Sequence, residues 1–196
     1  MRWEAVFWVG LSVGSLVLAQ VFWPRLRDRL GDWAELAERF APWAHGLIPA
    51  YLALISGALR ARDAGLIGHR PLAWVGGALV CGVWLGLAAF WKPREGNWPE
   101  PSRGVLDEPR WTLYRAAGSL WVGHFQFGVL VGLGLAALEW WLGWRARRVT
   151  DWETLARIAS SAVVFVLTRN FWLTALSQAA LLAILRRGAA PQQGQL

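Results

Sequence analysis

Polar residues with the chemical types of a hydrolytic or binding site lie inside or beside the apolar runs of this chain. Asp107 and Glu108 form the only adjacent acidic pair, and Tyr114 and Arg115 follow six and seven residues after Glu108. Adjacent carboxylates disfavour each other's ionised form, so one of the two can act as a general base. The alternative is a pair of acids at the start of a helix, where negative charge is favourable in any case.

His124 is the second candidate. As a general base or a metal ligand it needs a carboxylate or a second ligand nearby, and none stands at helical spacing from it. A short link joins the apolar runs that hold His124 and Gln178, which predicts neighbouring antiparallel helices with these two side chains at a similar depth. We therefore expect a hydrogen bond between His124 and Gln178, with Gln126 one step away. The alternative is a catalytic role shared with Glu108 and Arg115.

Arg169 and Asn170 lie near the middle of a 28-residue apolar run over 158–185. A guanidinium at the centre of a bilayer costs about 2.5–3.5 kcal/mol on insertion scales, so it must face protein or water and find a partner. Backbone carbonyls, Gln20 or a carboxylate of another helix are the partners that we expect. Arg169 is then either a structural clamp or, with Asn170, Gln178 and Gln126, part of a binding site.

Five apolar runs must position these groups, and they predict an all-α, polytopic transmembrane bundle. The runs cover residues 3–23, 43–60, 72–91, 116–144 and 158–185, so that residues 1–187 form a single transmembrane domain of about five spans. Pro49 should kink the second span. The chain holds 16 tryptophans, most of them near the ends of the runs, which is typical of residues at a membrane interface.

The segments between the spans predict the remaining elements. An amphipathic pattern over 25–41 indicates a helix lying on the membrane surface, residues 92–109 an irregular polar loop, and residues 188–196 a disordered tail. Three glycine pairs at four-residue spacing predict close helix contacts, at Gly10 and Gly14, Gly82 and Gly86, and Gly128 and Gly132.

Charge points to lipid rather than nucleic acid. The formal net charge is +7, and the positive residues lie mostly between apolar runs, where anionic headgroups are the natural partner. With five spans, eleven positive residues fall on the C-terminal side and eight on the other, which favours a cytoplasmic C-terminus. One cysteine, three scattered histidines and no phosphate-binding or dinucleotide motif indicate no metal and no cofactor.

Residues 62–187 resemble the CPBP family, which contains CAAX-type intramembrane proteases and bacteriocin-immunity proteins. Asp107-Glu108 and Tyr114-Arg115 resemble its EExxxR motif, although Arg115 follows Glu108 by seven residues rather than four. The stretch from Ser160 to Phe165 resembles the approach to its FxxxH motif, with Arg169 where the family has histidine. The family's final HxxxN helix has no counterpart. The resemblance implies a member whose peptidase motifs are degenerate.

We therefore expect a multi-pass protein of a bacterial cytoplasmic (inner) membrane. The first hypothesis is a CPBP-like, non-peptidase binding or immunity-type protein that holds a partner protein or lipid near Arg169 and His124. The second is an active intramembrane endopeptidase that uses Glu108, Arg115 and His124 on a peptide substrate. The third is a small subunit of a transporter or membrane complex, with the glycine faces as its contact surface.

Overall fold

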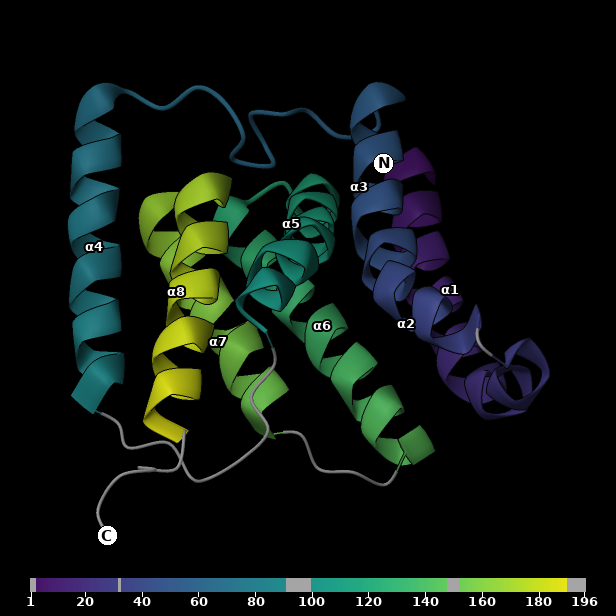
Figure 1. Ribbon diagram of the computed structural model, residues 1–196. Helices are drawn as coiled ribbons and strands as arrows, with labels where there is room; N and C mark the ends of the chain where they lie inside the picture. The colour runs from purple at the N-terminus through teal and green to yellow at the C-terminus, as the bar shows by residue number, and fades with distance from the viewer. Residues whose placement is uncertain (1–2, 32, 91–99, 148–151, 190–196) are drawn as a thin grey trace, which may run out of the picture.

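The computed structural model describes residues 3–31, 33–90, 100–147 and 152–189, and in these residues the chain is all-helical with no strand (Figure 1). The all-α prediction is therefore confirmed. The elements in chain order are α1 (Trp3–Leu30), α2 (Trp33–Pro42), the π-helix η1 (Trp43–Leu47), α3 (Ile48–Ile55), α4 (Pro71–Phe90), α5 (Pro101–Val122), α6 (Phe125–Arg147), α7 (Trp152–Thr168) and α8 (Phe171–Ala189).

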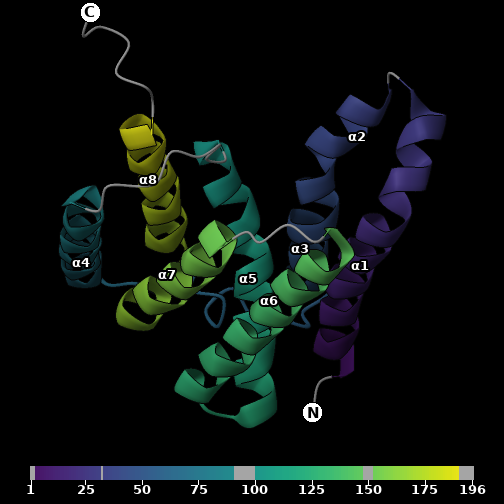
Figure 2. The ribbon, with the colours of Figure 1, turned by 90° about the horizontal axis from the view of Figure 1, so that it is seen from below.

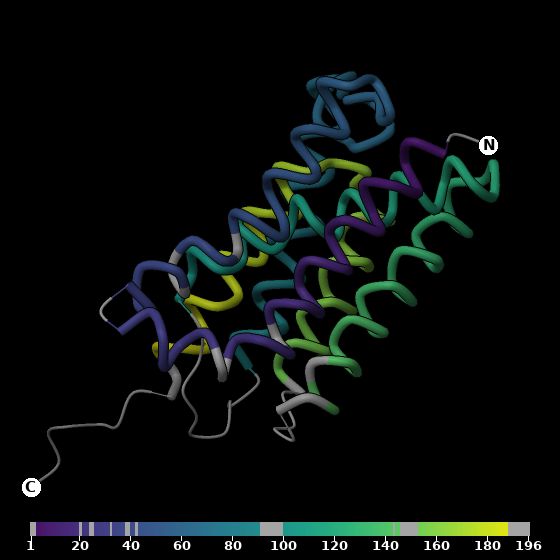
Figure 3. The backbone as a smooth tube through the Cα atoms, turned by 90° about the vertical axis from the view of Figure 1, so that its right-hand side faces the viewer, coloured from purple at the N-terminus to yellow at the C-terminus, as the bar shows by residue number. Residues whose placement is uncertain are grey.

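The helices run to and fro between two ends of the molecule, as Figures 1 and 3 show together. We call the upper end the one that holds the start of α1, the segment 56–70, the α5–α6 turn and the α7–α8 turn. The lower end holds the α1–α2 junction, the end of α4, the start of α5, the end of α6, the start of α7 and the end of α8. Successive passages are therefore antiparallel, which short connections favour.

Three of the helices are long and apolar enough to cross a membrane: Trp3–Trp23 in α1, Pro71–Phe90 in α4 and Phe125–Leu142 in α6. They correspond to the predicted runs over 3–23, 72–91 and part of 116–144. Each has 28% or less of its most apolar window buried inside the bundle, so these helices present their apolar side chains outward. That exposure is what a membrane protein requires and a water-soluble bundle avoids.

The run over 116–144 is not one helix. Helix α5 ends at Val122, Gly123 adopts a left-handed φ of 74°, and its N–H donates to the Ser119 carbonyl at 2.9 Å. This glycine cap reverses the chain, and α6 begins at Phe125 and packs back along α5. The sequence pattern could not separate the two helices because the residues on both sides of the turn are apolar.

The run over 158–185 is also two helices. Helix α7 ends at Thr168 and α8 begins at Phe171. Between them Arg169 has a φ of 50°, the only positive φ at a non-glycine position in the part of the chain that the structure describes. Asn170 then caps α8, its side-chain oxygen accepting the backbone N–H groups of Trp172 and Leu173 at 2.9 and 3.2 Å.

The predicted span over 43–60 is shorter and irregular. The π-helix η1 leads into α3, and Pro49 stands in the first turn of α3. Proline has no N–H for the His45 carbonyl four residues earlier, and the Ser12 hydroxyl donates to that carbonyl instead, at 2.6 Å. A side chain of α1 thus supplies a hydrogen bond to the carbonyl that the proline leaves without its helical partner.

Three other boundaries differ from expectation. Helix α1 continues to Leu30, so the amphipathic helix predicted over 25–41 is only α2, whose Trp33 and Phe40 are exposed. The expected loop over 92–109 is helical from Pro101 onward, because proline is well accommodated in a first helical turn. The predicted tail begins inside α8, which includes Gly188 and Ala189, and residues 190–196 lie outside the described chain.

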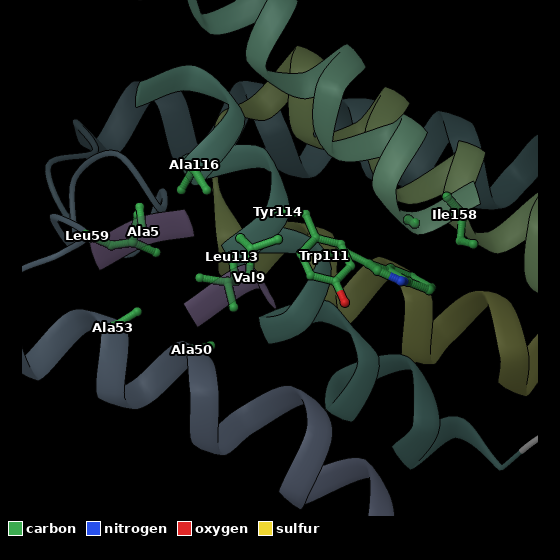
Figure 4. Packing of buried hydrophobic residues seen from close by; sticks show 12 residues of the cluster. Ala5, Val9, Ala50, Ala53, Leu59, Trp111, Leu113, Tyr114, Ala116 and Ile158 are labelled. Atoms are coloured by element: carbon green, nitrogen blue, oxygen red, sulfur yellow. The ribbon is translucent and has the colours of Figure 1, made fainter. Parts of the chain in front are cut away.

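Helix α5 occupies the middle of the bundle, between α1, α3 and η1 on one side and α7 and α8 on the other (Figure 2). Its residues Trp111, Leu113 and Tyr114 form the centre of the largest apolar cluster, against alanines of α1 and α3 (Figure 4). Glycines allow the neighbouring helices to approach it closely. A Cβ on Gly104 would lie 2.7 Å from the α8 backbone, and one on Gly132 would lie 2.7 Å from Arg115.

The glycine pairs do not behave alike. Gly128 and Gly132 of α6 pack against Ser119 and Arg115 of α5, which confirms the predicted close contact. Around the first two pairs, Gly10 and Gly14 on α1 and Gly82 and Gly86 on α4, no atom of a neighbouring element lies within 4 Å of the Cβ position among the described residues. The same spacing therefore serves internal packing in only one of the three cases.

This difference gives a paired test. Gly132→Ala should lower the free energy of unfolding in detergent by about 1–3 kcal/mol, because the new methyl group overlaps the α5 backbone. Gly10→Ala, in an open helix interior, should leave it unchanged or raise it by up to about 1 kcal/mol through helix propensity. Equal effects of the two substitutions would contradict the assigned α5–α6 packing.

Candidate functional site

The polar residues of α5 lie on two faces of one buried helix. Glu108, Thr112 and Arg115 follow the spacing i, i+4, i+7, and all three are at most 4% exposed. A second set, Asp107, Arg110 and Tyr114, follows the spacing i, i+3, i+7. Arg110 and Tyr114 of this set contact Glu139 of α6, and Tyr114 also contacts Ser12 of α1. The seven-residue separation of Glu108 and Arg115 is two helical turns, so that long side chains can meet along one face.

The first face forms a closed cluster with α7. Glu108 and Arg115 make a direct ion pair, and both are at most 3% exposed. The Ser161 hydroxyl donates to the second carboxylate oxygen of Glu108 at 2.7 Å and accepts from Arg115 at 2.8 Å. The Thr112 hydroxyl bridges the same two groups, at 3.4 Å from Glu108 and 2.9 Å from Arg115. Both carboxylate oxygens of Glu108 are therefore occupied by side chains of the protein.

The second face continues the network across three helices. Arg110 contacts Asp107 at 3.2 Å and Glu139 of α6 at 3.1 Å, and Arg157 of α7 contacts Asp107 at 2.8 Å. The Tyr114 hydroxyl donates to Glu139 at 3.0 Å. Counting both faces, three buried carboxylates, Asp107, Glu108 and Glu139, are matched by three buried guanidinium groups, of Arg110, Arg115 and Arg157. The buried core thus carries no net formal charge, which limits the cost of its burial.

A third polar contact lies between α4, α7 and α8. The Ser160 hydroxyl oxygen accepts from Trp84 at 2.9 Å and from the Gln178 amide at 3.1 Å. Gln178 is fully buried, and its side-chain oxygen has no hydrogen-bond partner among the described residues. The expected hydrogen bond between Gln178 and His124 is not formed. The Gln178 amide donates to Ser160 of α7 instead.

His124, Gln126 and Arg169 lie elsewhere, exposed at the upper end. His124 stands in the α5–α6 turn with its ring 6.2 Å from that of Phe127. The Arg169 guanidinium lies 4.1 Å above the Phe125 ring, in a cation–π contact. The expectation that Arg169 is held by buried polar atoms is therefore wrong, because the helix break places this residue at an accessible turn instead of mid-helix.

An aromatic pair separates this surface from the buried core. The rings of Phe125 and Phe165 are 5.9 Å apart, and the Arg115 guanidinium lies 4.2 Å from the far ring, that of Phe165. The exposed cation thus contacts one ring of this tilted pair and the buried cation contacts the other. The pair closes the upper side of the Glu108–Arg115 cluster with apolar surface.

The structure brings together Glu108 and Arg115 from the predicted catalytic set and leaves His124 outside it. Sequence reasoning missed Ser161, Arg157 and Glu139 as members of this network. The i, i+3, i+7 spacing of Asp107, Arg110 and Tyr114 was an available signal. In the described chain, no group of three or more His, Cys, Asp or Glu side chains could hold a metal ion.

Comparisons with known proteins found no matching family model, no matching curated protein and no matching solved structure.

The Glu108–Arg115 pair can be tested by a double-mutant cycle. Arg115→Met should cost about 3–5 kcal/mol of unfolding free energy, because it leaves the Glu108 carboxylate buried without its counter-ion. Adding Glu108→Leu should recover much of that loss, since two apolar side chains replace the pair. Chemical denaturation in detergent measures both. Additive losses would mean that the two side chains do not interact.

Proposed function

We propose that this chain is a multi-pass protein of a bacterial cytoplasmic membrane, similar to CPBP proteins but without peptidase activity, which binds an acidic partner protein at its upper end. The observation that carries the proposal is the closed state of the polar core. Glu108, the residue that resembles the family's water-activating acid, is fully buried, and protein groups occupy both of its oxygens.

Hydrolysis needs a carboxylate that can reach water and a substrate. A general base must lie within hydrogen-bond distance of the proton that it removes, directly or through one water. Here Arg115, Ser161 and Thr112 fill the positions around Glu108. His124, the second predicted catalytic residue, is exposed at the α5–α6 turn instead of facing that cluster. These features support a structural role for the motif that resembles the family's catalytic one.

An accessible polar surface lies at the upper end, away from the buried Glu108 cluster. His124, Gln126 and Arg169 are exposed on two turns that meet where Arg169 covers Phe125. Two hydrogen bonds hold the segment 56–70 against the start of α8. The Gly65 carbonyl accepts from the Phe171 N–H at 2.9 Å, and the Leu66 carbonyl accepts from the Trp172 indole N–H at 3.2 Å. A surface that is already ordered loses little entropy on binding.

The backbone at this surface depends on one glycine. Gly65 has a φ of 70°, and a Cβ there would lie 2.6 Å from the Arg169 carbonyl oxygen. The segment 56–70 also contributes Arg60, Arg62 and Arg70 against a single acid, Asp63. The chemistry of the surface is therefore that of an arginine-rich patch, which suits carboxylates of a partner.

Site-specific cross-linking tests the binding role. A photoreactive residue placed at Gln126 should capture a defined protein in cells, and the same residue at the exposed, apolar position Leu79 on α4 should not. Arg169→Ala should weaken the Gln126 cross-link about tenfold, the expected effect of losing one charge-assisted hydrogen bond. Capture of lipid only, or equal capture at Gln126 and Leu79, would contradict this role.

A reconstituted protease assay tests the absence of peptidase activity. The purified protein in liposomes should leave a set of fluorogenic transmembrane and CAAX-type peptides intact, because Glu108 has no access to water. Turnover that disappears in Glu108→Gln while the variant keeps its unfolding midpoint would establish the enzyme instead. A stable stoichiometric complex formed through α1 or α4 would favour the subunit hypothesis, since their glycine pairs are open.

A further inference from the structure

We propose that the chain crosses the membrane seven times, and that its lower end contacts the anionic headgroups of the cytoplasmic leaflet. The binding surface around Arg169 then faces the opposite compartment. This inference rests on the membrane location in the proposed function. It differs from both simpler topologies, the five spans that the sequence predicts and a topology with only the three helices that are long and apolar enough to cross a membrane by composition.

The first argument is the alternation of direction. The passages are α1, the α2–η1–α3 arm, α4, α5, α6, α7 and α8, and each runs between the upper and lower ends (Figures 1 and 3). Helices α5, α7 and α8 have 22, 17 and 19 residues. At about 1.5 Å per residue they are roughly 33, 26 and 29 Å long, close to the bilayer core of about 30 Å.

The second argument is that the charges inside α5 and α7, beyond the first turns that hold Arg103 and Glu153, are hidden from lipid. Asp107, Glu108, Arg110 and Arg115 on α5 and Arg157 on α7 are at most 7% exposed. These charges lower the mean hydropathy of both helices, although the buried side chains would not contact lipid. Away from the helix ends, the outward side chains of α7 and α8 are apolar, and the large ones are Val163, Val166, Leu167, Trp172 and Leu176. A bilayer around the bundle therefore meets apolar surface on these helices too.

The third argument is the position of the exposed tryptophans. In the described residues six of the seven lie near the two ends, and the seventh, Trp43, lies within the α2–η1–α3 arm. At the upper end Trp3, Trp74 and Trp172 begin α1, α4 and α8 and are 37–70% exposed. At the lower end the exposed tryptophans are Trp33 at the start of α2 and Trp141 and Trp144 near the end of α6. Two belts of exposed indoles mark the two interfaces of a membrane.

The fourth argument is the distribution of positive charge once the helix reversals are placed. Among the described residues, the helix ends at the lower end hold eight arginines: Arg25, Arg27 and Arg29 in α1, Arg103 in α5, Arg145 and Arg147 in α6, and Arg186 and Arg187 in α8. The described residues at the upper end hold four: three in 56–70 and Arg169. The positive-inside rule assigns the richer end to the cytoplasmic leaflet, whose anionic lipids attract arginine.

Cysteine accessibility tests this topology with little background, because Cys81 is the only native cysteine and is buried. In a Cys81→Ala chain, single cysteines replace four exposed residues, Arg62, His124, Arg145 and Arg187. An impermeant maleimide applied to cells with a permeabilised outer membrane should label positions 62 and 124. Positions 145 and 187 should react only after the inner membrane is opened.

Each alternative gives a different pattern and overturns the proposal. Three crossings, by α1, α4 and α6, place positions 62 and 124 on opposite sides. The five-span topology places positions 62 and 145 on the same side. The inverse pattern of seven crossings would refute the charge assignment. Recovery of the chain outside the membrane fraction after carbonate extraction would instead refute the proposed function, which separates the two failures.

A matched pair of charge variants tests the headgroup contact. Five lower-end arginines are replaced by glutamine: Arg27, Arg29, Arg145, Arg186 and Arg187. This reduces the lower-end count from eight to three, against four above. Part of the molecules should then insert in the inverse sense, so that labelling of a cysteine at position 124 before inner-membrane opening falls. Glutamine at Arg60, Arg62 and Arg70 should leave that labelling complete. Unchanged labelling in the lower-end variant would overturn the assignment.

Discussion

The fold depends on the mutual neutralisation of charges along one central helix. Burying a carboxylate or a guanidinium alone costs several kcal/mol, and the penalty is larger in a membrane, where no water can take the place of a missing partner. Helix α5 carries two acids and two arginines in its buried half, and α6 and α7 supply Glu139 and Arg157. Removal of any one of the six leaves an uncompensated charge in the interior.

The surrounding helices are placed by this network and by close backbone contacts. Helix α7 must bring Ser161 to Glu108 and Arg157 to Asp107 of α5, and α6 must bring Glu139 to Arg110. Glycines at the α5–α6 and α5–α8 contacts shorten the distances over which these side chains reach. Packing and charge pairing therefore specify the same arrangement, and this agreement between levels favours a single native structure. The outer helices α1 and α4 contribute mainly apolar surface and keep their glycine pairs open.

Much of this could be predicted from the sequence, and the remainder has a physical cause. Long apolar runs identified the helical class and the outer helices, because hydropathy measures what lipid-facing helices need. Hydropathy could not reveal the chain reversals at Gly123 and Arg169, because both turns are short and are flanked by apolar residues. Local signals existed, because glycine is the preferred left-handed residue after a helix and asparagine is a preferred N-cap. The Glu108–Arg115 spacing of two turns was also readable, whereas the partnership of Arg110 with Glu139 depends on how α6 folds back.

The closed core also decides where this chain can interact with other molecules. Polar groups that are paired with one another are not free to contact a substrate. In the described residues, the exposed arginines lie near the two ends of the helices. At the upper end one of them lies in a strained turn, where Arg169 adopts a left-handed backbone that non-glycine residues seldom use. Such a conformation persists only where the surroundings fix it, and Gly65, Phe125 and the Asn170 cap do so here. Arg169 contacts Phe125 and the buried Arg115 contacts Phe165, so two neighbouring rings lie between the surface cation and the ion pairs beneath it.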